Sequence, residues 1–401
     1  MRGREPDAAA RFRDRFGSDA RLRVDVPGRI NLIGDHIDYN GLGVLPLAIQ
    51  RRLRLHARPR PDNRLRAVSV DGRFPDCIFD LSADIASGPP GDWCNYVRAA
   101  AQDSCAHHSG LHGLDMLVES TIPVAAGLSS SSALVVATAL ALLHANAIDI
   151  DPLYLADRLA VAEHYVGTRG GGMDQAVLLG ARHGCAARID FRPLRLLHVP
   201  VPPGWFFVAA DSGVPAEKSR VMRAAYNTRA AECARALGPV SALLPGSDAT
   251  YSSLLQDRSV AALVDTAARV LEDTLLQRFR HVITEADRVR LAGLALDRND
   301  PAAFGALMDA SHASLRDDFH VSSPALDALV RVAKEAGAAG ARLTGAGFGG
   351  CIVALCTADV RDNVVHALRV HASTGAAAID GEERLVLVAE PSTGARITTL
   401  L

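Results

Sequence analysis

PGRINLIGDHIDYNGLGVLPLA, residues 27–48, carries much of the chemistry that can be read from this chain. It contains four polar side chains that can hydrogen-bond to hydroxyls or orient a carboxylate: Arg29, Asp35, His36 and Asp38. Alternating segments on either side, RLRVDV at 21–26 and VLPLAI at 44–49, predict strands. We therefore expect the polar cluster on the turn between these strands. DYNG alone is also typical of an ordinary hairpin turn, which leaves a purely structural role open.

A second motif, IPVAAGLSSSSAL at 122–134, follows a strand-length apolar run at 114–118 and precedes a long apolar helix expected to end near His144. Its glycine and small residues allow backbone N–H groups at a helix N-terminus to approach a phosphate, where the helix dipole favours negative charge. A serine hydroxyl there can also reach Mg²⁺. An ordinary serine N-cap is the alternative, although four consecutive serines exceed what capping requires. No Gly-Lys-Ser/Thr follows, which excludes a Walker loop.

Two further segments are rich in glycine. YVGTRGGGMDQ at 165–175 follows a helix predicted over 153–166 and places a triple glycine shortly before Asp174. GARLTGAGFGGC at 340–351 precedes a strand predicted over 351–355. Taken alone, each segment predicts no more than a turn between elements.

In this order, the segments resemble the motifs of the GHMP class of small-molecule kinases. GRINLIGDHIDY at 28–39 resembles the first sugar-binding motif of galactokinases, PVAAGLSSS at 123–131 the second GHMP motif, and residues 340–351 the third. The resemblance covers nearly the whole chain. It implies an α+β fold of two domains, an N-terminal mixed sheet with helices and a C-terminal ferredoxin-like domain, with the active site in the cleft between them.

Residues 1–200 and 201–401 are the expected domains, because the Pro-rich HVPVPPGW at 198–205 lies between strands predicted at 185–190 and 205–210. The N-terminal domain then carries the sugar motif at 27–48, the phosphate-binding loop at 123–134 and the catalytic segment at 167–175. The C-terminal domain carries the glycine motif at 340–351.

The remaining segments predict secondary structure without evident chemistry. RRLRLHA and LRAVSV, within 51–80, predict strands, and residues 259–337 are expected to be mostly helical. We expect the lone polar residues of this region, Ser311, His312 and His320, on helix surfaces or ends.

The resemblance implies an ATP-dependent sugar 1-kinase, with galactose as the first choice of sugar and Mg²⁺ as the metal ion. Asp174 and Arg29 are then the catalytic residues. The implied sugar-binding residues are Arg29, Asp35, His36, Asp38, Asp174 and Tyr226. The implied ATP-binding residues are Trp93, Gly127, Leu128, Ser129, Ser130, Ser131, Ser132, Ala133 and Lys218. The implied metal ligands are Ser131 and Glu163, with Ser130 and Ser132 as alternatives to Ser131. Trp93 can alternatively be a core or hinge aromatic, and Lys218 and Tyr226 can equally be solvated or packing residues.

Phosphoryl transfer passes through a loose transition state, so catalysis requires mainly positioning and charge neutralisation. Asp174 is expected either to orient or to deprotonate the anomeric hydroxyl, and the sequence leaves both roles open. Arg29 would hold Asp174 ionised and stabilise charge on the γ-phosphate. Asp35 departs from the family, which usually carries Glu there. Its shorter side chain is expected to reach the terminal hydroxyl of the sugar through water or not at all.

Other activities compete with galactose phosphorylation. HID at 36–38, GLSSSSAL at 127–134 and YVGTRGGGMDQ at 165–175 resemble the N-acetylgalactosamine kinase branch more than ordinary galactokinases, so N-acetylgalactosamine is the second choice of sugar. Some yeast relatives are non-catalytic sensors of galactose and ATP. They lack two residues just after the serine run, whereas Ser132-Ala133 is present here. Mevalonate and homoserine kinases lack the GDHIDYN-type motif and fit less well.

The composition excludes several kinds of partner. A formal net charge of -2 over 401 residues leaves no basic footprint for nucleic acid or an anionic membrane. No apolar run reaches the roughly 18 residues of a membrane span, and the N-terminus has no apolar core for a secretion signal. The seven cysteines, without a CxxC pair, indicate neither a disulfide framework nor a zinc site. We therefore expect a cytoplasmic protein, monomeric or weakly dimeric, whose partners are a sugar and ATP.

Overall fold

Strands β1 (Leu22–Ile33) and β2 (Leu45–Pro59) form an antiparallel pair inside a six-stranded sheet. The computed structural model describes residues 8–215, 220–244, 250–256, 258–374 and 384–400. The strand order is β12 (Arg396–Thr399), β1, β2, β5 (Leu114–Ser120), β3 (Arg64–Ser69) and β4 (Cys77–Asp80). β3 and β5 are parallel and the other neighbours are antiparallel, so the sheet is mixed, as the sequence predicts.

Helices pack on β1 and β2 and bury the sheet's apolar side chains. α3 (Ser130–Ala145) and α5 (Met173–Gly180) contact both strands directly, and α2 (Cys94–His107) and α4 (Pro152–Ala162) pack against α3 and α5. α3 is apolar nearly all round because it is enclosed in this way. The short helix α1 (Ala8–Phe16) contacts β2 and β5 and contributes Phe12 to a small separate core.

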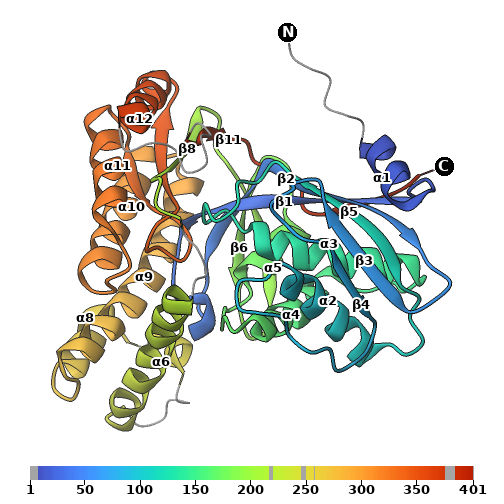
Figure 1. Ribbon diagram of the computed structural model, residues 1–401. Coiled ribbons are helices and arrows are strands. Elements are labelled where there is room, and N and C mark those ends of the chain that lie inside the picture. Colours follow the sequence, from blue (N-terminus) through green and yellow to red (C-terminus); the bar gives the residue numbers. More distant parts are fainter. Residues whose placement is uncertain (1–7, 216–219, 245–249, 257, 375–383, 401) are drawn as a thin grey trace.

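The second unit is built on a four-stranded antiparallel sheet. Its order is β11 (Val386–Ala389), β8 (Trp205–Asp211), β10 (Cys351–Thr357) and β9 (Gly340–Leu343). Its helices are α6 (Arg220–Ala242), α7 (Tyr251–Gln256), α8 (Val260–Ala267), α9 (Asp273–Asp297), α10 (Pro301–Asp317), α11 (Pro324–Glu335) and α12 (Arg361–Thr374). In Figure 1 these helices stand on the left and the six-stranded sheet lies on the right. A hairpin of β6 (Cys185–Asp190) and β7 (Arg195–Pro200) lies between the two sheets in the chain.

The chain returns to its first sheet at the end. β12 pairs antiparallel with β1, with Thr399 opposite Leu22, so these late residues complete the N-terminal sheet. The predicted boundary after residue 200 falls between β7 and β8. The division into domains at 1–200 and 201–401 stays a prediction. That division did not include the pairing of β12, from the C-terminal half, with β1 of the N-terminal sheet.

Two predicted local structures are wrong in detail. β1 does not stop at Val26: it shifts register between Pro27 and Gly28 and continues to Ile33, so Arg29 lies on a strand rather than on a turn. Burial on both faces keeps this stretch extended although a glycine interrupts it. The Pro-rich segment at 198–205 is not all linker either, because its first residues pair within β7.

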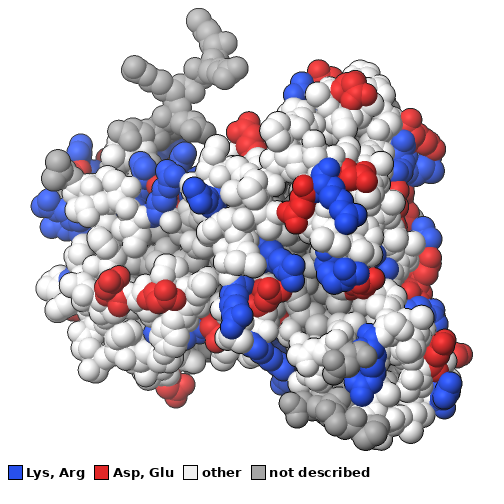
Figure 2. All heavy atoms as spheres, turned by 180° about the vertical axis from the view of Figure 1, so that it is seen from behind, with Lys and Arg blue, Asp and Glu red and all other residues white. Residues whose placement is uncertain are grey.

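Charged side chains are mixed over the surface. Figure 2 shows acidic and basic residues interspersed on the face that it presents, which agrees with the near-neutral charge of the sequence. Among the described residues, no helix has the length and apolar character needed to cross a membrane.

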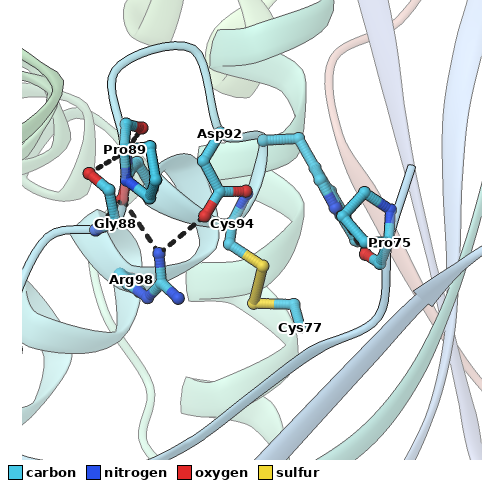
Figure 3. Close-up of a disulfide and its surroundings, with 9 residues drawn as sticks. Pro75, Cys77, Gly88, Pro89, Asp92, Cys94 and Arg98 are labelled. Atoms are coloured by element: carbon cyan, nitrogen blue, oxygen red, sulfur yellow. Dashed lines mark hydrogen bonds and ion pairs between the residues drawn. A yellow bond between two sulfur atoms is a disulfide. The ribbon is translucent and has the colours of Figure 1, made fainter. Parts of the chain in front are cut away.

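Two cysteines that gave no sequence signal are paired. Cys77 at the start of β4 and Cys94 at the start of α2 form a disulfide, 17 residues apart, with their Cα atoms separated by 5.6 Å (Figure 3). The sequence indicated no disulfide because the pairing depends on β4 and α2 meeting in space, not on a spacing motif. The expectation of a reducing cytoplasmic compartment rested partly on the cysteine pattern, and it stays a prediction.

Candidate active site

A cavity of about 1080 Å³ lies where the two units meet. The lining residues of the first unit include members of the sugar loop (residues 34–40), the phosphate loop (residues 123–129) and the start of α5. Those of the second unit include Tyr226 of α6 and members of the glycine loop (residues 344–350). Sequence segments more than 300 residues apart therefore face one space.

Arg29 and Asp174 form a two-pronged ion pair in this cavity. Arg29 Nε donates to Asp174 Oδ1 at 2.7 Å, and a terminal guanidinium nitrogen donates to Oδ2 at 3.0 Å. The other terminal nitrogen donates to the Gly127 carbonyl at 2.5 Å. Such a fork fixes both the charge and the orientation of the carboxylate. The structure thus brings together the two residues predicted to be catalytic.

The triple glycine that precedes Asp174 has a steric reason. A Cβ at Gly171 would lie 2.2 Å from the backbone nitrogen of Tyr39, so only glycine lets this segment lie against the sugar loop. Gly171 N donates to Asp38 Oδ2 at 3.1 Å across that contact. Gly172 then adopts a φ of 103° as α5 begins, which places Asp174 in the first turn, where the helix dipole favours a negative charge.

The charge states of the sugar loop follow from its burial. Burial, and after it the Asp174 charge, raises the pKa of Asp38 to about 6. Burial lowers the pKa of His36 to about 3, so its ring is neutral at neutral pH. His36 Nε2 donates to the Ala346 carbonyl at 3.1 Å, and its Nδ1 accepts from the Tyr39 hydroxyl at 3.1 Å. His36 lines the cavity with both ring nitrogens already engaged, so it joins the sugar loop to the glycine loop.

Tyr226 closes the sugar side of the cavity from α6. Its ring centroid lies 5.3 Å from that of His36 and 5.7 Å from that of Tyr39. Burial raises the pKa of the Tyr226 hydroxyl well above its ordinary value, so the phenol stays protonated. The structure therefore places Tyr226 beside the sugar loop and on the cavity. Its role as a sugar contact stays a prediction.

The predicted ATP-binding serines divide into two groups. Gly127, Ser129, Ser130 and Ser131 line the cavity, whereas Leu128, Ser132 and Ala133 are buried in the core behind it. Ser129, at a φ of 64° just before α3, donates its hydroxyl to Asp174 Oδ2 at 2.5 Å. Ser129 is thus committed to the catalytic carboxylate, and the α3 N-terminus at Ser130 and Ser131 is left facing the cavity.

The predicted metal ligands fit a magnesium ion in their chemistry. Ser131 and Glu163 both line the cavity and offer oxygen donors, which Mg²⁺ prefers. The described residues assemble no group of three or more His, Cys, Asp and Glu side chains suited to a metal. That is consistent with Mg²⁺ in kinases, which takes one or two protein ligands and completes its shell with phosphates and water.

The predicted nucleotide side of the cavity contains Trp93. Its indole nitrogen donates to the Pro75 carbonyl at 2.8 Å, and its ring lies 6.0 Å from that of Phe74. The Cys77–Cys94 disulfide is attached to the next residue, and Arg98 binds Asp92 at 3.0 Å beside it (Figure 3). Trp93 is 8% exposed and borders the cavity, so its ring packs in the core and also has an edge on the cavity. Its role in ATP binding stays a prediction. Lys218 lies outside the described residues.

The glycine loop touches the phosphate loop. Thr344 Oγ1 accepts from the Asn31 backbone N–H at 2.8 Å and donates to its carbonyl at 3.1 Å, which ties the loop to β1. A Cβ at Gly345, whose φ is 85°, would lie only 2.9 Å from the Gly127 carbonyl oxygen. The two loops can therefore meet because no side chain separates them.

The sequence missed the residues that hold the sugar loop from the second unit. Arg342 of β9 binds the Asp35 carboxylate. From α9, Glu285 accepts from Gly34 N at 2.9 Å and His281 Nε2 donates to the Asp35 carbonyl at 3.1 Å. His281 and Glu285 could have been noticed in the sequence, because these two polar residues interrupt the apolar, helically spaced stripe on the buried face of α9.

The placement predicted for Ser311 and His312 is wrong. Both are buried on α10, and Ser311 donates to Glu285 at 2.7 Å. They lie on the same helical face as Met308 and Leu315, a spacing of three and four residues that indicates burial. His320 follows the end of α10 and is exposed, as predicted.

Comparison with known families places this fold and cavity in the GHMP class of kinases. The model described as "GHMP kinases N terminal domain" matches residues 95–181, and that described as "GHMP kinases C terminal" matches residues 294–372. The model described as "Galactokinase galactose-binding signature" matches residues 10–59, which include the sugar loop.

Curated relatives narrow the class. A galactokinase from Roseiflexus sp. (strain RS-1) is 39% identical over 370 residues, 91% of each chain. A galactokinase from Chloroflexus aurantiacus is 38% identical over 365 residues, 90% of each chain. This chain belongs to the galactokinase family.

Solved structures agree. The crystal structure of Lactococcus lactis galactokinase complexed with galactose matches with a TM-score of 0.85 and 30% identity, over 98% of this chain and 99% of that one. The mevalonate kinase of Methanococcus jannaschii, 18% identical, matches with a TM-score of 0.60 over 94% of this chain and 100% of that one, and it shares the fold. The predicted two-domain GHMP kinase fold is confirmed.

Proposed function

We propose that this chain transfers the γ-phosphoryl group of ATP to the anomeric hydroxyl of galactose. A bond forms between the sugar C1 oxygen and the γ-phosphorus, the bond from that phosphorus to the bridging oxygen of ADP breaks, and the hydroxyl proton is released. The observation that carries the proposal is the forked Arg29–Asp174 pair between the sugar loop and the phosphate loop, in a member of the galactokinase family.

Asp174 acts in this proposal mainly by orientation. Its carboxylate already accepts from two Arg29 nitrogens and from Ser129, and each of these donors stabilises the charged form. Such a carboxylate is a weak base before the transition state. It accepts a hydrogen bond from the anomeric hydroxyl and takes the proton as the bond to phosphorus develops.

The phosphate loop and Arg29 neutralise charge on the other side of the transfer. Backbone N–H groups at the start of α3 bind the ATP phosphates, and Arg29 lies near enough to Asp174 to stabilise the γ-phosphoryl group as well. Ser131 and Glu163 would hold Mg²⁺, which would supply further charge neutralisation there.

The sugar loop reads the acceptor. Asp38 and Asp35 line the cavity and offer hydrogen-bond acceptors, and Tyr226 offers an aromatic wall from the second unit. Paired acceptors of this kind discriminate against sugars that leave them without a donor.

Asp174→Asn tests the catalytic assignment. An amide keeps the size of the side chain but loses the charge that orients and finally deprotonates the hydroxyl, so kcat is expected to fall by roughly 10²- to 10⁴-fold. Steady-state kinetics measures kcat, and calorimetric titration checks that ATP binding is retained. Asp149→Asn, at an exposed position before α4, is the control and should leave kcat unchanged. A near-normal kcat in Asp174→Asn would remove Asp174 from this role.

The sugar itself is tested by ADP release from ATP and Mg²⁺ with galactose, N-acetylgalactosamine, glucose, talose and no sugar. We expect the highest kcat/KM with galactose. A higher value with N-acetylgalactosamine would assign the chain to that acceptor. Sugar-dependent ATP binding without turnover of any sugar would instead indicate a sensor and overturn the catalytic proposal.

A further inference from the structure

One carboxylate of the sugar loop is held from the opposite unit. Asp35 belongs to the N-terminal unit and lines the cavity, whereas the guanidinium that binds it belongs to Arg342 on β9 of the C-terminal unit. We propose that Arg342 is a positioning residue for sugar recognition, which fixes the Asp35 carboxylate so that one hydroxyl of the sugar is read only when both units hold their native arrangement. The proposal rests on the proposed function.

Arg342 acts through Asp35 and not on the sugar. Its side chain is 0% exposed, and among the described residues that line the cavity Asp35 is present and Arg342 is not. A terminal nitrogen of Arg342 donates to Asp35 Oδ2, and the other donates to the Asn31 carbonyl at 3.3 Å. The guanidinium is thus fixed to the end of β1 as well as to the carboxylate.

The backbone around Asp35 is fixed separately. His281 donates to the Asp35 carbonyl, and Glu285 accepts from Gly34 N, both from α9. These contacts reach the main chain through groups other than the Arg342 side chain. Arg342 in addition fixes the direction of the Asp35 side chain and favours its charged form. The effect of Arg342 can therefore be measured separately from that of the loop's backbone.

The charge on Asp35 depends on this partner. Burial raises the pKa of Asp35, and the charge of Glu285 raises it further. The Arg342 guanidinium is the main influence that lowers this pKa. Without the guanidinium, a buried carboxyl tends to take up a proton, and a protonated carboxyl offers the sugar a different set of donors and acceptors. Loss of Arg342 should therefore act on the same sugar hydroxyl as loss of the Asp35 charge.

Purely structural contacts between the units would give a different result. A bridge that only stabilises the fold would, when removed, lower thermal stability and affect every sugar alike. A positioning residue must instead change the preference among sugars that differ in one hydroxyl. That ratio is independent of the amount of folded enzyme.

The test measures kcat/KM for galactose and for its 2-, 3-, 4- and 6-deoxy analogues in the wild type, Asp35→Asn and Arg342→Met. The wild type should discriminate against the analogue that lacks the hydroxyl read by Asp35 by about 10- to 100-fold, the range for a hydrogen bond to a charged group. Both variants should lose most of that discrimination for the same analogue. The double variant Asp35→Asn/Arg342→Met, which leaves no buried charge without a partner, should lose no more than either single variant.

Arg278→Met is the matched control. Arg278 of the same unit is also buried and donates to a carboxylate, Glu232, at 2.7 Å, but neither residue is among the described residues lining the cavity. We expect it to lower thermal stability and to keep the preference among the deoxy sugars. If Arg342→Met does not fold, Arg342→Lys and the double variant carry the test, because both lose the guanidinium that joins the Asp35 carboxylate to the Asn31 carbonyl.

Two results would overturn the proposal. One is an Arg342 variant that lowers kcat/KM equally for all five sugars, as Arg278→Met would. The other is an Asp35→Asn variant whose lost discrimination concerns a different hydroxyl from that of the Arg342 variants, or no hydroxyl. Absence of turnover of every sugar by the wild type is a separate outcome, and it would overturn the proposed function itself.

Discussion

Asp38 shows how strongly single residues of the site depend on their surroundings. Its pKa of about 6 comes from burial and from Asp174 nearby, so the carboxylate is ionised at neutral pH at a cost in free energy. The unfolded chain has no such cost, because the pKa of Asp there is near 3.8. The site therefore holds a charge that is useful for binding and unfavourable for folding.

We expect Asp38→Asn to be more stable than the wild type above pH 6. Because the folded pKa is raised, stability falls as pH rises from about 4 to 6, and the full cost is present above that window. The gain at pH 8 should be roughly 1 to 2 kcal/mol, discounted from the size of the shift because the side chain is only half-buried. At pH 4 the gain should vanish. Scanning calorimetry of both proteins at the two pH values measures it.

A carboxylate with the opposite shift provides the control for this experiment. Arg73 lowers the pKa of Asp71 through a side-chain hydrogen bond, so Asp71→Asn should gain nothing at pH 8. An Asp38→Asn gain of equal size at pH 4 and pH 8 would show that the effect is not one of charge.

The catalytic pair and the residue that positions Asp35 differ in how far sequence could predict them. Asp174 and Arg29 stand in motifs whose resemblance to those of GHMP kinases implied phosphoryl transfer, and the structure brings the two residues together. Arg342 stands within the glycine motif at 340–351, but the motif gives this arginine no role of its own. Its role depends on β9 reaching a loop 307 residues earlier, and no local pattern encodes that distance.

At the scale of elements, the contact between the glycine loop and the phosphate loop sets the geometry of transfer. Gly345→Ala would place a Cβ 2.9 Å from the Gly127 carbonyl and push the loops apart. Displacements of about 1 Å at a transfer site are costly, so we expect kcat/KM for ATP to fall by roughly 10- to 100-fold. Steady-state kinetics with varied ATP measures it.

Gly204→Ala isolates the backbone part of that effect. Gly204 has a φ of 86°, nearly the same as the 85° of Gly345, and a Cβ there meets nothing within 4 Å. Both variants incur the cost of a left-handed alanine, about 1 kcal/mol or more, but only Gly345→Ala separates the loops. Equal kinetic losses in the two variants would contradict the argument.

Regular elements were predicted well where one periodicity dominates. The apolar helix expected to end near His144 ends at Ala145. The errors occur where two signals compete. The strands predicted on either side of the sugar motif placed a turn between them, but burial on both faces continues β1 to Ile33. The prolines of 198–205 predicted a linker, but residues 198–200 pair with β6.

For the whole molecule, the return of β12 to β1 is the feature that the sequence did not indicate. All four residues of β12 are exposed, so the sequence has no alternation of apolar and polar residues there that would predict a strand. The two-domain architecture followed from the family resemblance that the motifs carry, whereas no motif predicts this crossing.

A chain that ends at Ala395 tests the contribution of β12. Losing the ladder to β1 and the bond from Leu400 N to the Arg21 carbonyl should cost about 2 to 4 kcal/mol, at about 1 kcal/mol for each hydrogen bond. The open edge of β1 should also promote association. Thermal unfolding and light scattering measure both effects. Ile397→Thr keeps the backbone ladder and should behave like the wild type, and an unchanged Tm in the shortened chain would contradict the prediction.

The pairing of β12 with β1 also bears on how the protein is made. A ribosome releases Leu22 long before Thr399, so the edge of β1 that receives β12 has no partner until residues 396–399 have been made. The N-terminal unit cannot finish its sheet as it emerges, as domains built from consecutive residues do. Completion of the first unit therefore waits for residues that follow the second, and the nascent chain carries an open strand edge until residues 396–399 emerge.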